Sequence, residues 1–242
     1  MRINNCRGIS AVEHNTAQVL TPEGLKHTEN VPLIREHRLE VFIEREPAFE
    51  LNCTPERLPE LVLGSLISSG AASLEDIESI ELSPNGRRAD VSIAGGAAAV
   101  DPEQLESIAW TAEQVRTLAQ CMRRDTPLHL LTRGTHSCFL ARNGELLFAG
   151  EDIGRHNALD KAIGWALMNG VDLRACMAHI SGRVPKDMVM KAVRAHVPVL
   201  VSKEAPTAEG LAAARRYGLT LVEAGRDGSI RTYGLDCAEE AH

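Results

Sequence analysis

Residues 146–168 constrain the fold most, because the hydrophobic period of the chain changes there at a polar turn. Residues 146–150 form a short apolar run, which indicates a buried strand. From Ala158 to Leu167, apolar residues recur every three or four positions, which predicts a helix that stops at Asn169. Asn157 is the predicted N-cap of this helix. A strand that leads through a polar turn into a helix is the repeating unit of α/β proteins.

Strand and helix patterns keep alternating through the C-terminal half. Strand-like apolar runs occupy residues 175–180, 197–201 and 219–222, and helical periodicity fills the intervals between them. Upstream, residues 137–149 alternate about an Asn-Gly pair, which predicts a hairpin. Residues 230–233 are a predicted edge strand. This order predicts a mostly parallel sheet with helices on its faces.

The N-terminal half has a different pattern. Residues 37–53 alternate and break at Glu46, which predicts a hairpin. Thr54 is the predicted N-cap of a helix that ends at Ser69. Residues 79–93 predict two further strands joined by a Pro-Asn-Gly turn. Strands and one helix in this order favour a small α+β unit.

Two more helices and a domain boundary complete the prediction. A short helix is expected from Ser73, and a long one from residue 103 to residue 124, after a bland Gly-Ala connector. The chain is therefore predicted to form a small α+β N-terminal domain, residues 1–100, and an α/β domain, residues 101–242. Residues 1–36 have weak periodicity and receive no assignment.

The composition excludes several classes of protein. The 242 residues carry a net charge of −7, which argues against a general nucleic-acid or anionic-membrane surface. Only 3% of the residues are aromatic, too few for base-stacking platforms. No apolar run is long enough to span a membrane. Residues 1–5 lack the apolar core of a signal peptide, so we expect a cytoplasmic protein.

The six cysteines are scattered, and no two of them form a Cys-x-x-Cys pair. This spacing favours reduced thiols over a disulfide framework. It also argues against zinc, because the His-x-Glu and Pro-Cys-x-x-Cys signatures of zinc deaminases are absent. We therefore expect no metal site.

Polar loops follow four of the predicted strands, at residues 151–157, 181–185, 202–207 and 224–229. Because the C-terminal ends of parallel strands lie along one edge of a sheet, we expect these loops to meet there. Three of them lead into helix N-termini, which attract anions. The pattern predicts a phosphate or nucleotide site, and for any single loop the alternative is an ordinary helix cap or a solvated ion pair. The cations of these loops are Arg155, Arg183, Lys203 and Arg226.

A further polar loop, residues 132–138, contains His136 and Cys138. In a strand these two side chains share a face, so a charged imidazole could lower the pKa of the thiol. The alternative is burial of Cys138 as a small apolar side chain.

These loops resemble those of the formate dehydrogenase accessory sulfurtransferase family, FdhD. The resemblance rests chiefly on the run from Glu151 to Lys161, and it extends from about residue 35 to residue 233. Other segments with a similar sequence are Cys53-Thr54-Pro55, Leu63-Gly64, Ser181-Gly182-Arg183, Lys191-Ala192, Ala205-Pro206-Thr207 and Gly218-Leu219-Thr220-Leu221-Val222.

The resemblance implies a larger domain with a three-layer α/β/α, cytidine-deaminase-like fold. Family members are cytoplasmic and often dimeric, and they accept persulfide sulfur from a cysteine desulfurase. They bind the bis-molybdopterin guanine dinucleotide form of the molybdenum cofactor and sulfurate it for formate dehydrogenase or a related molybdoenzyme. GDP or GTP would then mimic the guanine end of this cofactor.

Together, the polar loops and the resemblance predict a set of cofactor-binding residues. The predicted residues are Thr132, Gly134, His136, Asp152, Gly154, Arg155, His156, Asn157, Lys161, Ser181, Gly182, Arg183, Ser202, Pro206, Thr207, Ala224, Gly225, Arg226, Asp227, Gly228 and Ser229.

The chain departs from the family at its sulfur-carrying position. The family has a Cys-x-x-Cys loop where residues 94–100 contain no cysteine, and its Thr-Gly-Gly-x-His pattern is altered at residues 132–136. Because sulfur transfer through a thiol needs a reachable nucleophile, Cys138 is the candidate catalytic residue within the polar loops.

Two other functions stay open. One is a molybdenum-cofactor carrier, or a guanine-nucleotide-binding chaperone for a molybdoenzyme, that performs no sulfur chemistry. The other is a nucleotide hydrolase that uses Asp152, His156 and Asp160 for acid–base catalysis.

Overall fold

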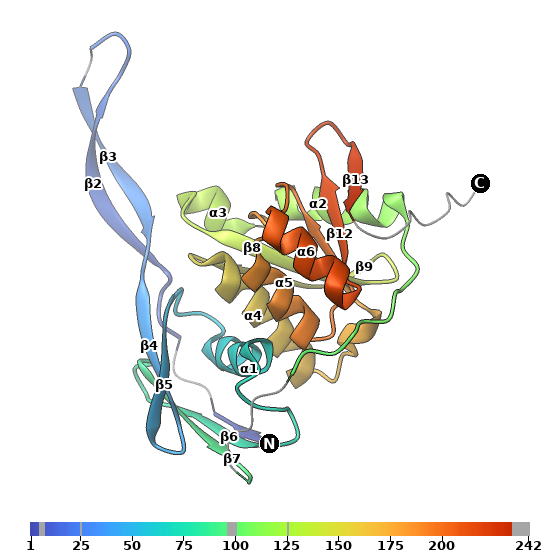
Figure 1. Cartoon of the computed structure of the whole chain (residues 1–242). Helices are drawn as coiled ribbons and strands as arrows, with labels where there is room; N and C mark the ends of the chain where they lie inside the picture. The colour runs from blue at the N-terminus through green and yellow to red at the C-terminus, as the bar shows by residue number, and fades with distance from the viewer. Residues whose placement is uncertain (5–7, 25, 96–100, 125, 234–242) are drawn as a thin grey trace.

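The computed structural model describes residues 1–4, 8–24, 26–95, 101–124 and 126–233. Two sheets, their helices and a projecting hairpin organise the chain (Figure 1). Within the described ranges, no helix is long and apolar enough to cross a membrane.

A six-stranded sheet forms the C-terminal half. Its strands are β8 (His136–Arg142), β9 (Glu145–Asp152), β10 (Met177–Ile180), β11 (Val199–Ser202), β12 (Thr220–Ala224) and β13 (Ile230–Tyr233). Their order is β13-β12-β11-β10-β8-β9, and β10, β11 and β12 run parallel. β8 is antiparallel to both β9 and β10, so β9 points the same way as β10. The predicted hairpin and the mostly parallel sheet are confirmed.

Helices cover both faces of this sheet (Figure 1). One face packs against α4 (Arg155–Met168), α5 (Lys186–Arg194) and α6 (Ala208–Tyr217), and the other packs against α2 (Ala112–Arg124). The alternation of β8 fits both layers: Cys138 and Leu140 belong to the first core, whereas Phe139 and Ala141 belong to the second. The predicted three-layer α/β/α fold is confirmed. A short 3-10 turn, Leu173–Ala175, precedes β10.

A five-stranded sheet forms the N-terminal half, in the order β1-β6-β7-β4-β5. The strands are β1 (Arg2–Ile3), β4 (His37–Ile43), β5 (Glu46–Cys53), β6 (Ile77–Leu82) and β7 (Arg88–Ile93). One helix, α1 (Leu58–Ser69), packs with this sheet in a separate apolar core. Both predicted hairpins are confirmed. The first one turns at Glu44 and Arg45, which have positive φ angles of 50° and 71°.

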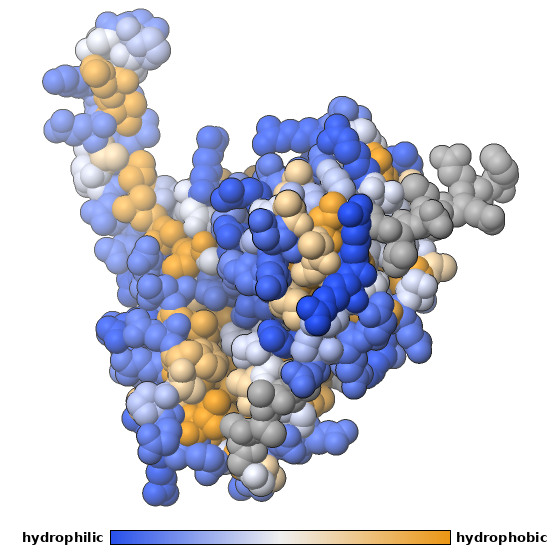
Figure 2. Space-filling view, viewed as in Figure 1, coloured by the Kyte–Doolittle hydropathy of each residue, from blue (hydrophilic) through white to orange (hydrophobic). Residues whose placement is uncertain are grey.

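A second hairpin, β2 (Val12–Leu20) and β3 (Lys26–Ile34), projects from the body as a two-stranded arm (Figure 1). Figure 2 shows an apolar stripe along it, between hydrophilic side chains. Its base contacts the cavity region, since a Cβ on Gly134 would lie 2.8 Å from Cγ2 of Ile34. The sequence gives no signal for this hairpin because most of its residues are exposed and carry little apolar alternation.

The helices α1 and α4 cross in direct backbone contact. A Cβ on Gly64 would lie 1.8 Å from the carbonyl oxygen of Asp160, and a Cβ on Gly164 would lie 1.8 Å from that of Glu60. Nine of the 12 residues of α1 are buried, so this helix is enclosed on nearly every side. Only glycine permits two helices to cross so closely. This crossing joins the N-terminal half of the chain to the C-terminal half.

A buried ion pair lies beside this crossing. Lys161 Nζ is 2.6 Å from Asp152 Oδ2, and both side chains are fully buried. The backbone N–H of Thr54 donates to the same carboxylate at 2.9 Å, and Lys161 donates to Thr54 Oγ1 at 2.6 Å. Asn157 donates to Asp152 and to the carbonyl of Asn52. The end of β9 is therefore tied to the end of β5.

A second buried carboxylate ties α4 to α1 and α5. Asp160 accepts hydrogen bonds from Ser65 and Ser68 of α1, at 3.0 and 2.6 Å. It also pairs with Lys191 of α5 at 2.8 Å. Asp160 thus bridges three helices in a place where an unpaired charge would be very unfavourable.

Both predicted N-caps, Thr54 and Asn157, are wrong. Helix α1 begins at Leu58 after Arg57, which adopts a left-handed conformation, and α4 begins at Arg155 after Gly154. The Thr54 and Asn157 side chains bond the buried polar groups around Asp152 instead, so tertiary contacts override the local capping preference.

Three helix predictions also need correction. No helix begins at Ser73, where the chain forms a turn. The helix expected from residue 103 begins only at Ala112, because Leu105 is buried and its N–H donates to the carbonyl of Tyr217. A short helix that was not predicted, α3 (Pro127–Thr132), follows α2. The predicted connector at residues 96–100 lies outside the described residues, and the two-domain division stays a prediction.

We expect Gly164→Ala to lower the free energy of unfolding by about 1–3 kcal/mol, the usual cost of overpacking. The new Cβ would collide with the Glu60 carbonyl, which outweighs the roughly 1 kcal/mol that alanine gains over glycine in a helix. Urea unfolding measures the change. The matched control is Gly8→Ala, because a Cβ there meets nothing within 4 Å. A Gly164→Ala variant as stable as the native chain would contradict the close crossing.

We expect Lys161→Met to lower the free energy of unfolding by about 3–5 kcal/mol, because it leaves the buried Asp152 charge unpaired. The double variant Asp152→Asn/Lys161→Met should recover much of this loss, since it removes both charges. Arg38→Met, which breaks an exposed pair with Glu40, serves as the control and should change stability far less. Equal unfolding midpoints for Lys161→Met and Arg38→Met would contradict the assignment.

Candidate functional site

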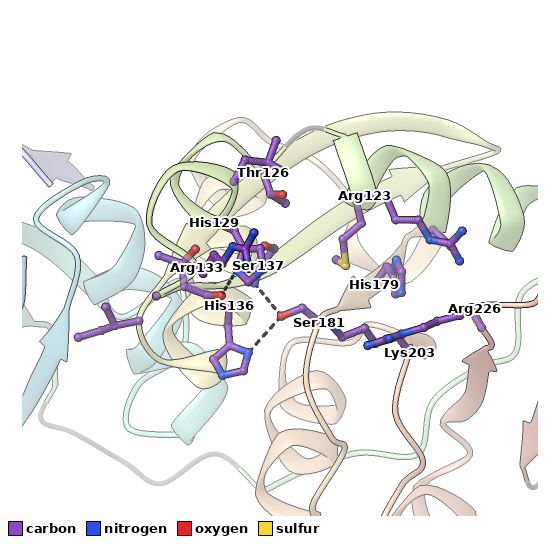
Figure 3. Close-up of a pocket in the computed structure, with 17 residues that line it drawn as sticks. Arg123, Thr126, His129, Arg133, His136, Ser137, His179, Ser181, Lys203 and Arg226 are labelled. Atoms are coloured by element: carbon purple, nitrogen blue, oxygen red, sulfur yellow. Dashed lines mark hydrogen bonds between the residues drawn. The ribbon is translucent and has the colours of Figure 1, made fainter. Parts of the chain in front are cut away.

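A cavity of about 660 Å³ opens at the edge of the six-stranded sheet, between the sheet and the helices α2 and α3 (Figure 3). The C-terminal ends of β9, β10, β11 and β12 meet at this edge, and so does the start of β8. The predicted convergence of the polar loops on one sheet edge is therefore confirmed. The volume is in the range of small-molecule sites.

The charges that line the cavity all have one sign. Its lining includes four permanent cations, Arg123, Arg133, Lys203 and Arg226, and the three histidines His129, His136 and His179. None of the described lining residues is acidic. A strongly basic concavity on a chain with a net charge of −7 indicates an anionic ligand.

The cavity has an exposed rim and a buried floor. All four cations lie on the rim and are exposed. The floor carries no permanent charge and consists of the buried residues Ala119, Met122, Thr126, Thr135, Ser137, His179 and Ala224. In Figure 3, Arg123, Lys203 and Arg226 surround His179, whereas Arg133 lies with His129 nearer the other end.

His179 stands out on the floor because it is only 2% exposed and both of its ring nitrogens are buried. Burial lowers its pKa to about 4, and a hydrogen bond with the backbone of Leu118, the next largest effect, partly opposes this shift. The nearby charges of Lys203 and Arg123 lower the pKa further. The ring is therefore neutral at pH 7 and offers one donor and one acceptor.

His136 and Ser181 form a hydrogen-bonded pair across β8 and β10 (Figure 3). The Ser181 hydroxyl oxygen accepts from the N–H of Ser137 at 3.0 Å and lies 3.1 Å from His136 Nδ1. The hydroxyl can therefore donate to Nδ1, which leaves the proton of a neutral ring on Nε2. Burial lowers the pKa of His136, and the charge of Arg155 adds to this effect.

Glu151 holds the wall of the cavity in place from behind. Its carboxylate accepts from the backbone N–H groups of Leu128 and His129, at 2.8 and 2.7 Å, and from Thr135 Oγ1 at 2.9 Å. A carboxylate at the first turn of α3 also compensates the positive end of the helix dipole. Glu151 thus positions α3, which supplies His129 and Leu130 to the cavity.

The structure divides the predicted site residues into groups. Five line the cavity: Gly134, His136, Ser181, Ala224 and Arg226. Three lie directly behind these residues: Thr132, which accepts from the N–H of Gly134, and Arg155 and Gly182, which pack beside His136. Arg183 is exposed and lies outside the cavity lining.

Most of the other predicted residues stabilise the loops. Asp152, Asn157 and Lys161 belong to the buried network around Thr54, and Gly154 is the N-cap of α4. Ser202 donates to the carbonyl of Gly182, Thr207 caps α6, and Pro206 bridges to Val184. Asp227 accepts from Ser229, and Gly225 and Gly228 close the same turn. His156 lies 2.8 Å from Asp187.

Cys138 cannot act as the reachable thiol that the sequence suggested. Its side chain is fully buried in the core between the sheet and α4, and it does not line the cavity. Burial raises the pKa of the Cys138 thiol, and the Asp160 charge acts in the same direction. His136 does share its strand face but does not activate it. The prediction of a catalytic Cys138 is therefore wrong.

The residues predicted for a hydrolase, Asp152, His156 and Asp160, do not form a catalytic site either. Asp152 and Asp160 are each buried in an ion pair with a lysine, and neither lines the cavity. In the part of the chain that the structure describes, no cluster of three His, Cys, Asp or Glu residues could hold a metal ion.

Several cavity residues escaped the sequence analysis. His129 and Arg133 were missed because the short helix α3 was not predicted, although Pro127 after Thr126 is a helix-start signal. Arg123 was predicted only as part of the charged end of the preceding helix. His179 was missed because it lies within an apolar strand, two residues before Ser181 and on the same face.

Comparisons with known proteins agree with this architecture. A family model described as the FdhD/NarQ family matches residues 92–236. A relative named Sulfur carrier protein FdhD, from Halalkalibacterium halodurans, is 27% identical over 244 residues and covers 88% of this chain and 90% of its own length. A protein of the same name from Methanothermobacter thermautotrophicus is 34% identical over 190 residues, covering 70% of this chain and 75% of its own.

A solved structure supports the same relationship over nearly the whole chain. The crystal structure of a putative formate dehydrogenase accessory protein from Desulfotalea psychrophila superposes with a TM-score of 0.83 at 26% identity. The match covers 93% of this chain and 98% of the other. The arrangement of two sheets, the three-layer C-terminal half and the matching sequence together show that this chain belongs to the FdhD/NarQ family.

Proposed function

We propose that this protein is a formate dehydrogenase accessory protein that binds the bis-molybdopterin guanine dinucleotide molybdenum cofactor as its cargo. The observation that carries this proposal is the cavity with four rim cations and no acidic residue in its described lining. The diphosphate of a guanine dinucleotide carries the negative charge that such a rim attracts. Membership of the FdhD/NarQ family supports the same ligand class.

The energetics of the rim are sufficient for binding. A charge-assisted hydrogen bond to a phosphate oxygen contributes about 1.5–3 kcal/mol, so three strong ones reach roughly micromolar affinity. Arg123, Lys203 and Arg226 lie close together in Figure 3 and could share one diphosphate. The neutral His136–Ser181 pair beside them offers additional hydrogen bonds.

The proposed partners follow from the family and from the names of its members. We propose a cysteine desulfurase as the sulfur source, formate dehydrogenase or a related molybdoenzyme as the recipient, a homodimer as the assembly and the cytoplasm as the location. The name of these relatives, Sulfur carrier protein FdhD, supports the proposal that this protein transfers sulfur to the bound cofactor.

A second candidate is a cofactor carrier that performs no sulfur transfer, and the cysteines favour it. Residues 94–100 contain none. Of the four cysteines in the described part of the chain, Cys53, Cys138 and Cys176 are buried, and burial raises the pKa of each of these thiols. Cys121 is half-buried on α2 and does not line the cavity.

Calorimetry with GDP tests the binding site. We expect the native chain to bind GDP, and Lys203→Ala and Arg226→Ala each to weaken binding roughly tenfold or more, since each removes a charge-assisted hydrogen bond. The matched control is Arg215→Ala, which removes the same charge from an exposed position on α6. No GDP binding by the native chain, or an equal loss in Arg215→Ala, would contradict the proposal.

Incubation with a cysteine desulfurase and ³⁵S-cysteine separates the two candidate functions. We expect no reductant-sensitive label on Cys138, because its thiol is buried. Label on another cysteine, mapped by peptide analysis and lost in its serine variant, would support transfer, whereas no label on any cysteine would support the carrier. Label on Cys138 that disappears in Cys138→Ser would contradict the burial argument.

A further inference from the structure

Arg155 is a cation without a counterion at the edge of the six-stranded sheet. It is the first residue of α4, and its side chain is half-buried. Its Nε is enclosed without a hydrogen-bond partner, and its two terminal nitrogens, which are not enclosed, form no hydrogen bond or ion pair with a described residue. The next residue, His156, by contrast lies 2.8 Å from Asp187. Charged side chains that leave water are usually paired, so the burial of Arg155 calls for a partner that the described chain does not supply.

His136 lies beside this cation and also has an unused polar atom. A Cβ on Gly182 would lie 3.1 Å from Arg155 Cδ and 3.5 Å from His136 Nδ1, so both side chains pack against the same glycine. The Ser181 hydroxyl lies 3.1 Å from His136 Nδ1, and its donation there leaves the proton of the neutral ring on Nε2. Nε2 is not enclosed and has no hydrogen bond to a described residue. A donor next to Arg155 is therefore open to a ligand.

The charges that act on His136 are all positive. They come from Arg155, Lys203, His129 and His156. The nearby carboxylates are engaged elsewhere. Asp152, opposite His136 in the β8–β9 ladder, is paired with Lys161, and Glu151 bonds the first turn of α3. Cations gathered from α3, α4 and the loop after β11 repel one another, and a bound anion relieves this repulsion.

The geometry points to a second anion subsite, in which the Arg155 guanidinium and the Nε2–H of His136 bind one phosphate-type oxyanion and Ser181 positions the imidazole. The subsite is distinct from the rim cations Arg123 and Arg226, which line the cavity from α2 and from the loop after β12. The inference rests on the proposed function for its ligand class and adds a second place for a phosphate group. The occupant is a phosphate group of the bound nucleotide or a free tetrahedral oxyanion.

Sulfate titration, followed through the imidazole ¹H–¹⁵N NMR signals of His136, tests the subsite. Sulfate is a tetrahedral oxyanion, and the His136 signals are identified by their loss in His136→Gln. We expect these signals to shift saturably in the native chain. Arg155→Met should weaken this binding about tenfold, because it removes a charge-assisted hydrogen bond, and Arg155→Lys should recover part of the affinity. The matched control is Arg215→Met, which removes the same charge from an exposed position on α6 and should leave the sulfate affinity unchanged.

Urea unfolding without added anion separates a binding role of Arg155 from a structural one. Arg155→Met keeps a side chain of similar length beside Gly182 and removes an unpaired charge. We therefore expect its unfolding midpoint to be no lower than that of the native chain. A lower midpoint would show that Arg155 has a partner within the chain and would overturn the subsite.

GDP added to the sulfate-saturated protein identifies the occupant. Displacement of sulfate from His136 assigns the subsite to a phosphate group of the nucleotide, and simultaneous binding assigns it to a free oxyanion. His136 signals that ignore sulfate, or equal sulfate affinities in the native chain and Arg155→Met, would overturn the subsite and leave the rim and the proposed function standing. Sulfate saturation at His136 without any GDP binding would overturn the proposed function and leave the subsite to a free oxyanion.

Discussion

The crossing of α1 and α4 is the constraint on which the rest of the structure depends. Each helix presents a glycine to a backbone carbonyl of the other, Gly64 to Asp160 and Gly164 to Glu60. Because the backbones touch, the neighbouring carboxylates are sealed from water and must be neutralised by partners. Lys161 and Lys191 supply them. The polar turn that precedes α4 is thereby fixed relative to both sheets.

The run from Glu151 to Lys161 supports the cavity mostly from outside its lining. Asp152, Asn157 and Lys161 bond one another and the end of β5. Of this run, Ile153 lines the cavity, and the other lining residues come from α2, α3 and the turns beside it, the start of β8, and the ends of β10, β11 and β12 with the loops after them. Most polar residues of the run therefore support the wall of the cavity and do not line it.

Features that follow from hydrophobic periodicity, such as strands and helices, were predictable from the sequence. Features that depend on contacts between distant residues were missed. The strands of the C-terminal sheet and its mostly parallel character follow from apolar runs that must be buried on both faces, so they were predictable. The caps at Thr54 and Asn157 failed because both side chains have buried partners far away in sequence. The β2–β3 hairpin is mostly exposed, so its sequence lacks the regular apolar alternation of a buried strand. His179 was not predicted as a site residue, because only the folded structure shows that one face of its strand borders a cavity.

Glu151 links two regions that the chain otherwise keeps apart. Its carboxylate holds the first turn of α3, and its carbonyl accepts from Lys161 Nζ at 3.2 Å within the network that contains Thr54. A single residue therefore touches both the cavity wall and the joint between the two halves. Thermodynamic reciprocity applies to such a link. A molecule that favours α3 docked on Glu151 stabilises the joint, and anything that strains the joint lowers affinity for that molecule by the same factor.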